Sequence, residues 1–392
     1  MSSRIRVLHP ITRLIIGGAQ ENTMLTAQLL DKSEWDVAIV SGPQTGSEGS
    51  LIETVRERGI PLILETSLVR EVNPIKDLLA VFRLARLMKR GGYTIVHTHS
   101  SKAGIVGRWA AKLAGVPIIV HTVHGWAHHD RQHPLLRAYY IWMEKLTLPI
   151  TDKLIVVSGL NIEKGLQDGI GKPDDYMVIR SGIELDRFGH PQVPREQMRT
   201  VLGIPLDAPV IGTVTRLSPQ KAPLDFIRAA ATVAQSHPKT YFVMVGDGPL
   251  RAEVEQLARQ LGIADHLVLT GLRRDVPELM ATFDIFVLSS LWEGLPRVLP
   301  QAMATGLPLV ATATDGSVEA VQEGANGLLV PPSDPASLAQ ALLRLLNTPA
   351  LARQMGEAGR ASVEEFSDRK MVAQIAALYR QLLGAKKMSA KG

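Results

Sequence analysis

The chain has 392 residues, a formal net charge of +5, no cysteine and 45% hydrophobic residues. This length exceeds what one hydrophobic core supports and fits two domains, while the lack of cysteine excludes disulfides and thiolate nucleophiles and fits a reducing cytoplasm. The small charge excess does not indicate nucleic-acid binding, and no uncharged apolar run reaches the roughly 18–20 residues of a membrane span. We therefore expect a cytoplasmic protein with at most peripheral contact with an anionic membrane, on the inner face of the plasma membrane.

Short β-branched runs alternate with longer amphipathic stretches through the first half of the chain, which is typical of a parallel α/β fold. A glycine-containing loop, GGAQENT at 17–23, leads from the first predicted strand into a helix. The strands expected in this half are 5–11, 36–42, 94–100, 117–125 and 153–159.

Two stretches of this half combine apolar, aromatic and cationic residues: KDLLAVFRLARLMKR at 76–90 and RQHPLLRAYYIWMEK at 131–145. The first is amphipathic, and its cations gather toward the C-terminus, where they oppose the helix dipole favourably. An ordinary domain helix is the interpretation we favour, and a membrane-facing helix that collects a lipid-linked acceptor is the alternative. The aromatic residues of the second stretch suit the same interface.

Nine of the eleven histidines precede residue 191, and His99 and His124 end predicted strands. The carboxyl edge of a parallel sheet is where such folds bind ligands, although a hydrogen-bonded core histidine is the alternative interpretation of His124. His129 and His133 could share a helix face and bind a metal. An acceptor cleft explains this cluster at least as well.

The α/β pattern pauses in a polar stretch with three prolines and then restarts. We expect an N-terminal Rossmann-like domain at 1–188, a linker at 189–208, a C-terminal Rossmann-like domain at 209–368, and a helix and tail at 369–392 that cross back to the N-terminal domain. The strands expected in the second half are 209–217, 240–248, 267–272, 284–290, 308–314 and 327–330.

Polar and glycine residues stand at strand ends of the second half. Arg216 and Lys221 suit a diphosphate, although two exposed loop cations explain them equally well. Gly246 opens a turn, VGDGPLR, whose N–H groups could face an anion, but the full G-x-G-x-x-G pattern is missing. Glu293 directly follows another strand, and a helix-start acid favoured by the dipole is its alternative interpretation. No P-loop pattern occurs, which argues against a kinase or ATPase.

Residues 289–319, SSLWEGLPRVLPQAMATGLPLVATATDGSVE, closely resemble the retaining glycosyltransferases of family 4. That family's pattern is a Glu, seven residues, a second Glu, A-M-A-x-G-x-P, and then a glycine-containing turn and a Glu. The segments GGAQENT, TVHG, SGIELDRF and TRLSPQK resemble further elements of the family in the right order, so the resemblance covers most of the chain. It implies the GT-B fold, in which two Rossmann-like domains face each other across a cleft. The N-terminal domain would bind the acceptor and the C-terminal domain the nucleotide sugar.

The resemblance also implies roles for single residues. Arg216 and Lys221 would hold the donor diphosphate, and Glu293 would contact hydroxyls of the transferred sugar. His124 would reach that sugar from the opposite domain, so His124 and Glu293 are the candidate catalytic residues. The other donor-site candidates are Gly18, Gly246, Leu272, Arg273, Gly294, Leu295, Pro296 and Gln301, and those of the acceptor or phosphate loop are Gly17, Gly18 and His99.

Two positions depart from the family's pattern. Gln301 stands where relatives have the second Glu, which resembles a clamp on the nucleotide ribose. Glutamine keeps the length and a carbonyl acceptor but loses the charge, so we expect donor binding to weaken by on the order of 1 kcal/mol without loss of transfer. Asp315 stands where many relatives have glycine, which puts the donor preference in further doubt.

The implied reaction is transfer with retention from a nucleoside-diphosphate sugar, most often UDP-linked in relatives, to a polyprenyl-linked or other cell-envelope saccharide. No Asp-x-Asp pair follows a strand, so we expect neither a metal nor another cofactor. A GT-B sugar-nucleotide epimerase would need carboxylates in the N-terminal half, where the strand ends offer histidines. A non-catalytic glycan- or protein-binding relative is supported by Gln301 alone.

Overall fold

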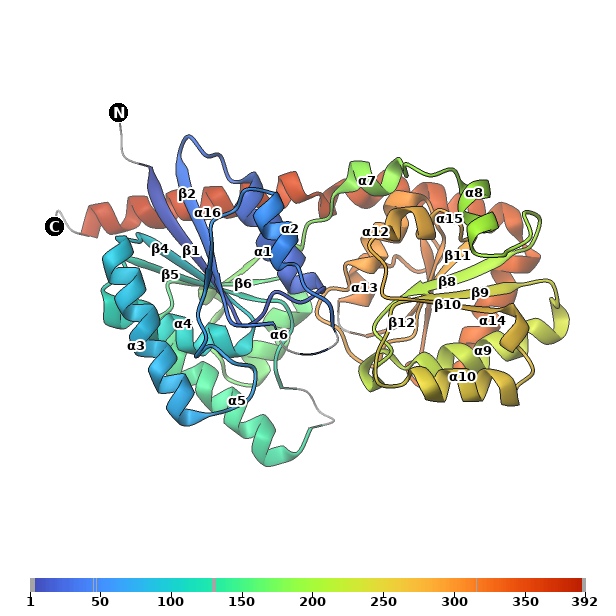
Figure 1. Cartoon of the computed structure of the whole chain (residues 1–392), viewed down its shortest axis with the longest axis horizontal. Helices are drawn as coiled ribbons and strands as arrows, with labels where there is room; N and C mark the ends of the chain where they lie inside the picture. Colours follow the sequence, from blue (N-terminus) through green and yellow to red (C-terminus); the bar gives the residue numbers. More distant parts are fainter. Residues whose placement is uncertain (1–3, 45, 47, 129–131, 315, 390–392) are drawn as a thin grey trace. The chain divides into compact units, whose positions relative to one another are not determined.

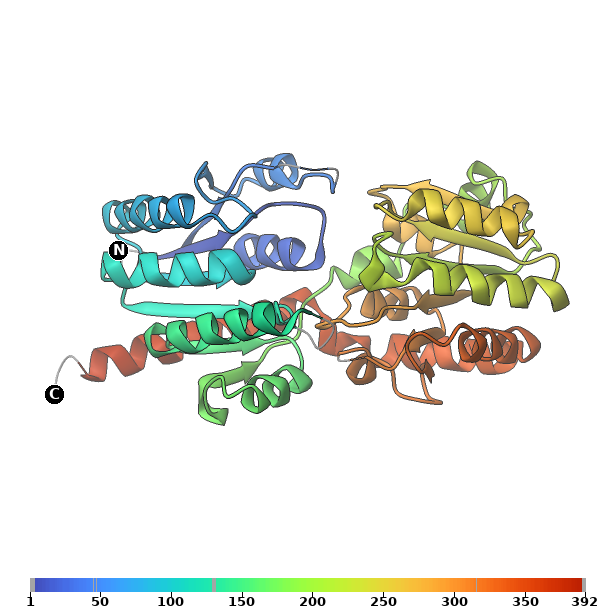
Figure 2. The same ribbon diagram turned by 90° about the horizontal axis from the view of Figure 1, so that it is seen from below.

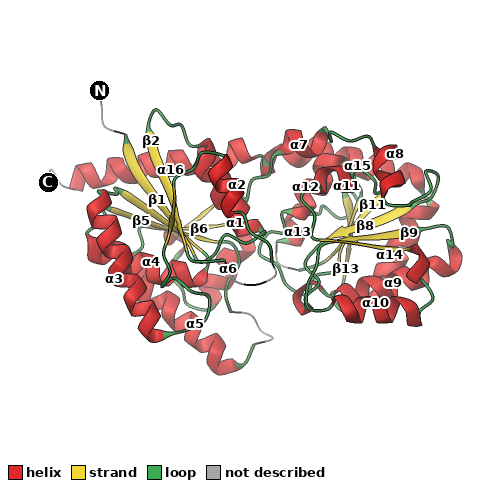
Figure 3. Ribbon diagram, in the orientation of Figure 1, coloured by secondary structure: helices red, strands yellow, loops and turns green. Residues whose placement is uncertain are grey.

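The computed structural model describes the chain except residues 1–3, 45, 47, 129–131, 315 and 390–392. Contacts divide the chain into two units, which we call unit 1 (residues 1–182 with 368–392) and unit 2 (183–367). Each unit is a Rossmann-like α/β domain built on a parallel sheet, as expected (Figures 1 and 3).

Unit 1 contains seven parallel strands in the order β3-β2-β1-β4-β5-β6-β7. The interior strand β1 pairs with β2 and β4, with Val7 opposite Val37 on one side and Ile95 on the other. The strands are β1 (Ile5–Ile11), β2 (Trp35–Ser41), β3 (Leu62–Leu64), β4 (Ile95–His99), β5 (Ile118–Val123), β6 (Lys153–Val156) and β7 (Tyr176–Val178).

Helices cover both faces of this sheet because its strands are apolar on both sides. Val7 and Ile11 of β1 join the core under α1, α2 and the C-terminal helix α16, whereas Leu8 joins the core under α3 and α4. Figure 2 shows α3, α4 and α5 over the second face. The helices of unit 1 are α1 (Gly18–Leu29), α2 (Ile52–Glu57), α3 (Pro74–Gly91), α4 (Ser101–Ala114), α5 (Pro134–Thr147), α6 (Gly159–Gln167) and α16 (Asp368–Ser389).

The helix α16 returns the C-terminal end of the chain to unit 1. Its Tyr379 is fully buried and meets Trp35 edge-on, with the ring centroids 5.4 Å apart. Arg380 of the same helix forms an ion pair with Glu34 at 2.6 Å. A buried aromatic contact and an ion pair therefore attach a segment that is remote in sequence to the start of β2.

Unit 2 repeats the arrangement with six parallel strands in the order β10-β9-β8-β11-β12-β13. They are β8 (Val210–Val214), β9 (Tyr241–Val245), β10 (Leu267–Gly271), β11 (Ile285–Leu288), β12 (Leu309–Thr312) and β13 (Gly327–Val330). The helices are α7 (Leu185–Gly189), α8 (Arg195–Val201), α9 (Pro223–Ser236), α10 (Arg251–Gln260), α11 (Val276–Met280), α12 (Val298–Thr305), α13 (Ser317–Ala320), α14 (Pro335–Asn347) and α15 (Pro349–Ser362). One core lies between the sheet and α9, α10 and α14.

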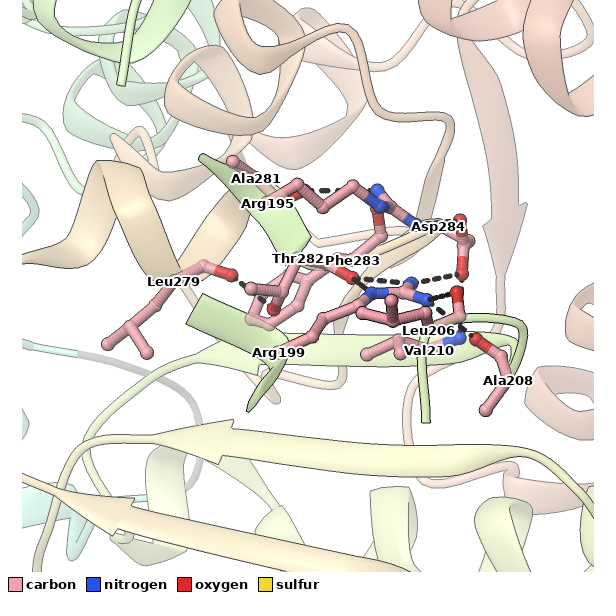
Figure 4. A network of polar contacts seen from close by, with 10 residues as sticks. All are labelled: Arg195, Arg199, Leu206, Ala208, Val210, Leu279, Ala281, Thr282, Phe283 and Asp284. Carbon is pink, nitrogen blue, oxygen red and sulfur yellow. Dashed lines mark hydrogen bonds and ion pairs between the residues drawn. The ribbon is translucent and has the colours of Figure 1, made fainter. Parts of the chain in front are cut away.

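The segment 189–208, which the sequence suggested as a linker, folds as part of unit 2. Figure 4 shows its Arg195 and Arg199 converging on Asp284, which precedes β11. Arg199 is 2% exposed and donates to the carbonyls of Thr282 at 2.8 Å and Ala208 at 3.0 Å. Asp284 also accepts from the Val210 N–H at 2.8 Å. This network fixes the chain entering β8, so the proline-containing segment is not a free connection.

In the part of the chain that the structure describes, no helix combines the length and the apolar composition needed to cross a lipid bilayer.

Candidate functional site

The strand order of unit 2 creates a topological switch point between β8 and β11. These two strands are neighbours in the sheet, yet the chain leaves them in opposite directions across it. The loops that follow such strands diverge and leave room for a ligand at the carboxyl edge. In unit 2 these loops are 215–222 and 289–297.

An ion pair bridges the two loops at this switch point. The Lys221 ammonium hydrogen-bonds the Glu293 carboxylate, with the side chains 21% and 8% exposed. Gln220 supports the bridge, because its side chain donates to the Trp292 carbonyl at 2.9 Å and its carbonyl accepts from the Leu291 N–H at 2.8 Å. The two charged groups are thus held together on anchored backbone at the edge where ligands bind.

Two glycines allow the neighbouring loops to approach this point closely. A Cβ on Gly246, which has φ +131°, would lie 2.0 Å from the Thr215 carbonyl oxygen. A Cβ on Gly316 would lie 2.0 Å from the carbonyl oxygen of Gly294. No side chain fits at either position, so the backbone of the loops after β8, β9, β11 and β12 packs at one edge of unit 2.

The structure brings the other predicted donor-site residues of unit 2 to the same edge, whereas Gly18 lies in unit 1. Arg216 is exposed two residues after the end of β8, and Leu272 is 45% exposed directly after β10. Arg273 donates from Nε to Asp275 at 2.8 Å, and this hydrogen bond raises the pKa of the guanidinium. Gln301 is 8% exposed in α12, the helix that follows Glu293 and the Gly294–Pro296 turn. Asp315 lies outside the described residues.

Unit 1 has its own switch point, between β1 and β4. The Thr12 hydroxyl and the Ser100 hydroxyl are 2.7 Å apart, and the Ala103 N–H donates to Thr12 at 3.1 Å, so the loops after these strands are joined. Gly17 caps the N-terminus of α1, and Gly18 is the exposed first residue of that helix. The N-terminus of α1 therefore lies at this edge of unit 1.

Histidines fill the space just below the edge of unit 1. His9 of β1 meets His99 of β4 at 2.9 Å, and His99 meets His124 at 3.1 Å. His9, His97 and His99 are fully buried, whereas His124 is half-buried. Burial lowers the pKa of His9 to about 3 and the pKa values of His97 and His99 well below their ordinary value, so these rings are neutral.

Sequence reasoning missed His9 because it reads as one residue of an apolar strand. The observable signal is that His9 lies two residues after Val7, on the face that α16 covers. His9, His97 and His99 are also a group that could hold a metal, since one nitrogen of each lies within 4.8 Å of the others. His129, the partner of His133 in the expected metal pair, lies outside the described residues.

Two Rossmann-like units with a charged pair at a switch point are typical of proteins that bind nucleotide-containing ligands. Profiles of two families match this chain: "Glycosyl transferases group 1" over residues 194–362 and "Glycosyl transferase 4-like domain" over residues 17–182. The chain belongs to the group 1 glycosyl transferases, and it is a glycosyltransferase with the GT-B fold.

Known relatives are similar in sequence to most of this chain. The chain is 33% identical, over 96% of its length and 97% of the relative, to the Escherichia coli enzyme UDP-Gal:alpha-D-GlcNAc-diphosphoundecaprenol alpha-1,3-galactosyltransferase. It is 31% identical to the putative glycosyltransferase EpsD of Bacillus subtilis over 77% of this chain and 80% of that one. The fold is similar to Anabaena HepE in complex with UDP and glucose, with TM-score 0.82, 21% identity and coverage of 96% of this chain and 100% of that one.

Proposed function

We propose that this glycosyltransferase moves a sugar from a UDP-sugar to a saccharide carried on a polyprenyl diphosphate, with retention at the anomeric carbon and without a metal or other cofactor. The observation that carries the proposal is the Lys221–Glu293 pair at the switch point of unit 2. A relative that is similar from end to end acts from UDP-Gal on a diphosphoundecaprenol-linked sugar, which supports the classes of donor and acceptor.

In the proposed reaction unit 2 holds the donor. Lys221 and the exposed Arg216 neutralise the diphosphate as negative charge develops on it. The carboxylate of Glu293 accepts hydrogen bonds from hydroxyls of the transferred sugar, and the 294–296 backbone adds N–H donors. We propose metal independence because two cationic side chains, Lys221 and Arg216, lie where the diphosphate would bind and can hold it without a metal ion.

The proposed chemistry takes place on one face of the sugar. The acceptor hydroxyl oxygen bonds to the anomeric carbon as the bond from that carbon to the diphosphate oxygen breaks. The hydroxyl proton passes to the departing phosphate oxygen, so the configuration is retained and no carboxylate base is required. His124 at the carboxyl edge of unit 1 contributes a hydrogen bond to the reacting sugar.

A panel of UDP-, GDP- and ADP-sugars tests this function. We expect slow nucleotide release from one UDP-sugar, faster release when a polyprenyl-diphosphate saccharide is added, and a product whose anomeric proton coupling matches that of the donor. Binding of nucleotide without any release would favour a non-catalytic relative, and an inverted product would exclude the retaining mechanism.

A Gln301→Glu variant should bind UDP several-fold more tightly than the wild type, because a charge-assisted hydrogen bond is about 1 kcal/mol stronger than a neutral one. Isothermal titration with UDP measures this change. The matched control is Gln322→Glu, an exposed position between α13 and β13. Equal affinities of the two variants would contradict the ribose-clamp role of residue 301.

We also propose that one face of unit 1 contacts an anionic membrane. On α3 the exposed Ile75, Leu78, Leu79 and Phe82 follow the spacing of one helical stripe. On α5 the exposed Leu135, Tyr139, Trp142 and Leu146 do the same. An apolar stripe on a soluble domain requires a partner for that stripe.

The charges around these stripes favour anionic lipid as the partner. The exposed cations of α3 are Lys76, Arg83, Arg86, Lys89 and Arg90, and neither α3 nor α5 exposes a fully accessible acidic side chain, since Asp77 is partly covered and Glu144 is buried against Arg108. An open pocket beside α5 adds Arg137 and Lys145 next to Trp142. Cations next to apolar stripes suit the headgroup region of an anionic bilayer.

Replacing both Phe82 and Trp142 with serine should weaken binding to vesicles containing anionic lipid by about tenfold or more, because two aromatic side chains no longer leave water. Co-sedimentation measures the bound fraction, and raising the salt concentration should release the wild type. The control is Val201→Ser with Leu206→Ser, which removes exposed apolar residues of unit 2. Equal binding of both double variants to anionic vesicles would overturn the assignment. So would equal binding of the wild type to neutral and to anionic vesicles.

A further inference from the structure

Three histidines of unit 1 form a continuous hydrogen-bonded chain that ends at His124. His9 Nδ1 faces His99 Nε2 at 2.9 Å, and His99 Nδ1 faces His124 Nε2 at 3.1 Å. The strands β1 and β4 supply the first two rings, and the third follows β5. The chain runs from the buried face under α16 to a half-buried ring at the carboxyl edge.

The rings meet through their nitrogens, end to end. The centroids of His9 and His99 are 5.2 Å apart with planes inclined by 19°, and those of His99 and His124 are 5.4 Å apart with planes inclined by 29°. In each pair the distance between ring centroids exceeds the distance between the facing nitrogens by about one ring width. This is the value expected when the two nitrogens lie on the line that joins the centroids, so each hydrogen bond lies near the planes of both rings. One proton stands between each pair of nitrogens.

His97 holds the middle ring of this chain in place. It packs against His99 with ring centroids 4.4 Å apart. Its own nitrogens are engaged by the Tyr379 hydroxyl at 2.6 Å and the Thr122 hydroxyl at 2.6 Å. The His97 ring is therefore fixed by α16 and β5, and it limits rotation of the His99 ring.

The buried end of the chain decides which way its protons point. A neutral imidazole has one N–H donor and one acceptor nitrogen, so the neutral rings of His9 and His99 allow only two proton patterns along the chain. His9 Nε2 is buried and has no hydrogen-bond partner among the described residues. A buried N–H without an acceptor is the more costly alternative, so the favoured pattern leaves a lone pair on His9 Nε2 and the proton on His9 Nδ1.

We propose that His9 and His99 are positioning residues that hold His124 in the tautomer with its proton on Nδ1. His9 Nδ1–H donates to His99, and His99 Nδ1–H donates to His124 Nε2, which leaves His124 as a neutral hydrogen-bond donor through Nδ1. Its ligand is then an acceptor, a sugar hydroxyl or phosphate oxygen, and His124 does not act as a base. This assignment rests on the proposed function.

The same rings do not suit a metal in this arrangement. Two in-plane nitrogens at 2.9 Å have room for a proton between them, whereas a tetrahedral zinc ion needs each nitrogen about 2.0–2.1 Å from it and the lone pairs converging on one point. Both nitrogens of His97 already have hydroxyl partners. Metal binding is therefore an outcome that the experiment has to separate from the proposal.

The test is nitrogen-15 NMR of the full chain labelled at histidine, without substrate, because the shift of each ring nitrogen reports whether it carries a proton. We expect His9, His99 and His124 all to carry the proton on Nδ1. A proton on His124 Nε2 in the wild type would overturn the proposal. So would a zinc titration that removes the protons of His9 and His99 and binds at one equivalent.

Two variants at position 9, whose side chains are isosteric with each other, supply the second part of the test. His9→Asp offers only acceptors, so His99 should reverse and His124 should move its proton to Nε2; His9→Asn can still donate and should preserve the wild-type pattern. With the donor sugar, kcat of His9→Asp should be about 10- to 100-fold below that of His9→Asn, with similar KM. Thr98→Val controls for packing, because it removes from β4, the strand that carries His99, a buried hydroxyl that hydrogen-bonds His121 of β5.

The two arms separate this inference from the proposed function. The expected tautomers without any sugar transfer would leave the histidine chain standing and overturn the transferase proposal. Transfer with His124 protonated on Nε2, or with the same His124 tautomer in both position-9 variants, would overturn the histidine chain alone.

Discussion

A Lys221→Met variant should lose about 10²- to 10³-fold in kcat/KM with the UDP-sugar, because it removes a cation aimed at charge that develops on the leaving diphosphate. Methionine keeps most of the apolar stem, so the change is one of charge. Steady-state nucleotide release measures the loss. The midpoint temperature of thermal unfolding should also be lower in this variant, because the 8% exposed carboxylate of Glu293 loses its ion pair with Lys221.

A double variant separates the two effects of that change. Adding Glu293→Gln to Lys221→Met removes the buried carboxylate charge that Lys221 no longer offsets, so it should restore much of the stability and none of the activity. Lys239→Met is the matched control, because this exposed lysine precedes β9 at the opposite edge of the unit 2 sheet. Unchanged kcat/KM in Lys221→Met would show that the pair is structural and that the donor diphosphate binds elsewhere.

The ends of most strands were predictable because local patterns encode them, whereas the short edge strands β3 and β7 of unit 1 were not predicted. Runs of β-branched residues marked the central strands, and a polar residue or glycine directly after a run marked the carboxyl edge. Lys221 and Glu293 were found this way, each from its own strand. That the two side chains form an ion pair was not visible, since they are 72 residues apart in sequence.

The parts that the sequence did not reveal depend on pairing between distant segments. Tyr379 meets His97 across 282 residues, and His9 meets His99 across 90. Arg199 lies in the segment expected to be a linker, but it reaches the Thr282 carbonyl, 83 residues away, and folds with unit 2. Hydrophobic periodicity predicts which face of an element is buried, but it does not predict which polar groups meet there. Buried polar networks therefore cannot be predicted from it.

The buried histidines of unit 1 should make its stability fall steeply as the pH drops below about 6.5. Burial lowers the pKa of His9 to about 3 and the pKa values of His97, His99 and His121 well below 6.5, so the folded unit keeps these rings neutral. In the unfolded chain they bind protons near their ordinary pKa of about 6.5. Below that pH the unfolded state binds more protons, so acid favours unfolding.

The size of this effect follows from the number of protons taken up. Each one contributes roughly 1.4 kcal/mol per pH unit, so four histidines give about 5.6 kcal/mol per unit, a large share of a typical domain's stability of about 5–15 kcal/mol. The carboxyls with lowered pKa, such as Glu65 and Asp275, lose their stabilising ionisation only below about pH 4.5, in a separate window.

Urea unfolding followed by tryptophan fluorescence at pH 7.5, 6.5 and 5.5 measures this dependence. Four of the five tryptophans, at 35, 109, 126 and 142, lie in unit 1, so the signal reports mainly on that unit. Replacing His121 with asparagine should reduce the slope by about one proton, whereas Thr98→Val should leave it unchanged. A free energy of unfolding that stays constant from pH 7.5 to 5.5 would mean that the buried rings are charged or solvated, and the neutral histidine chain would then fail with it.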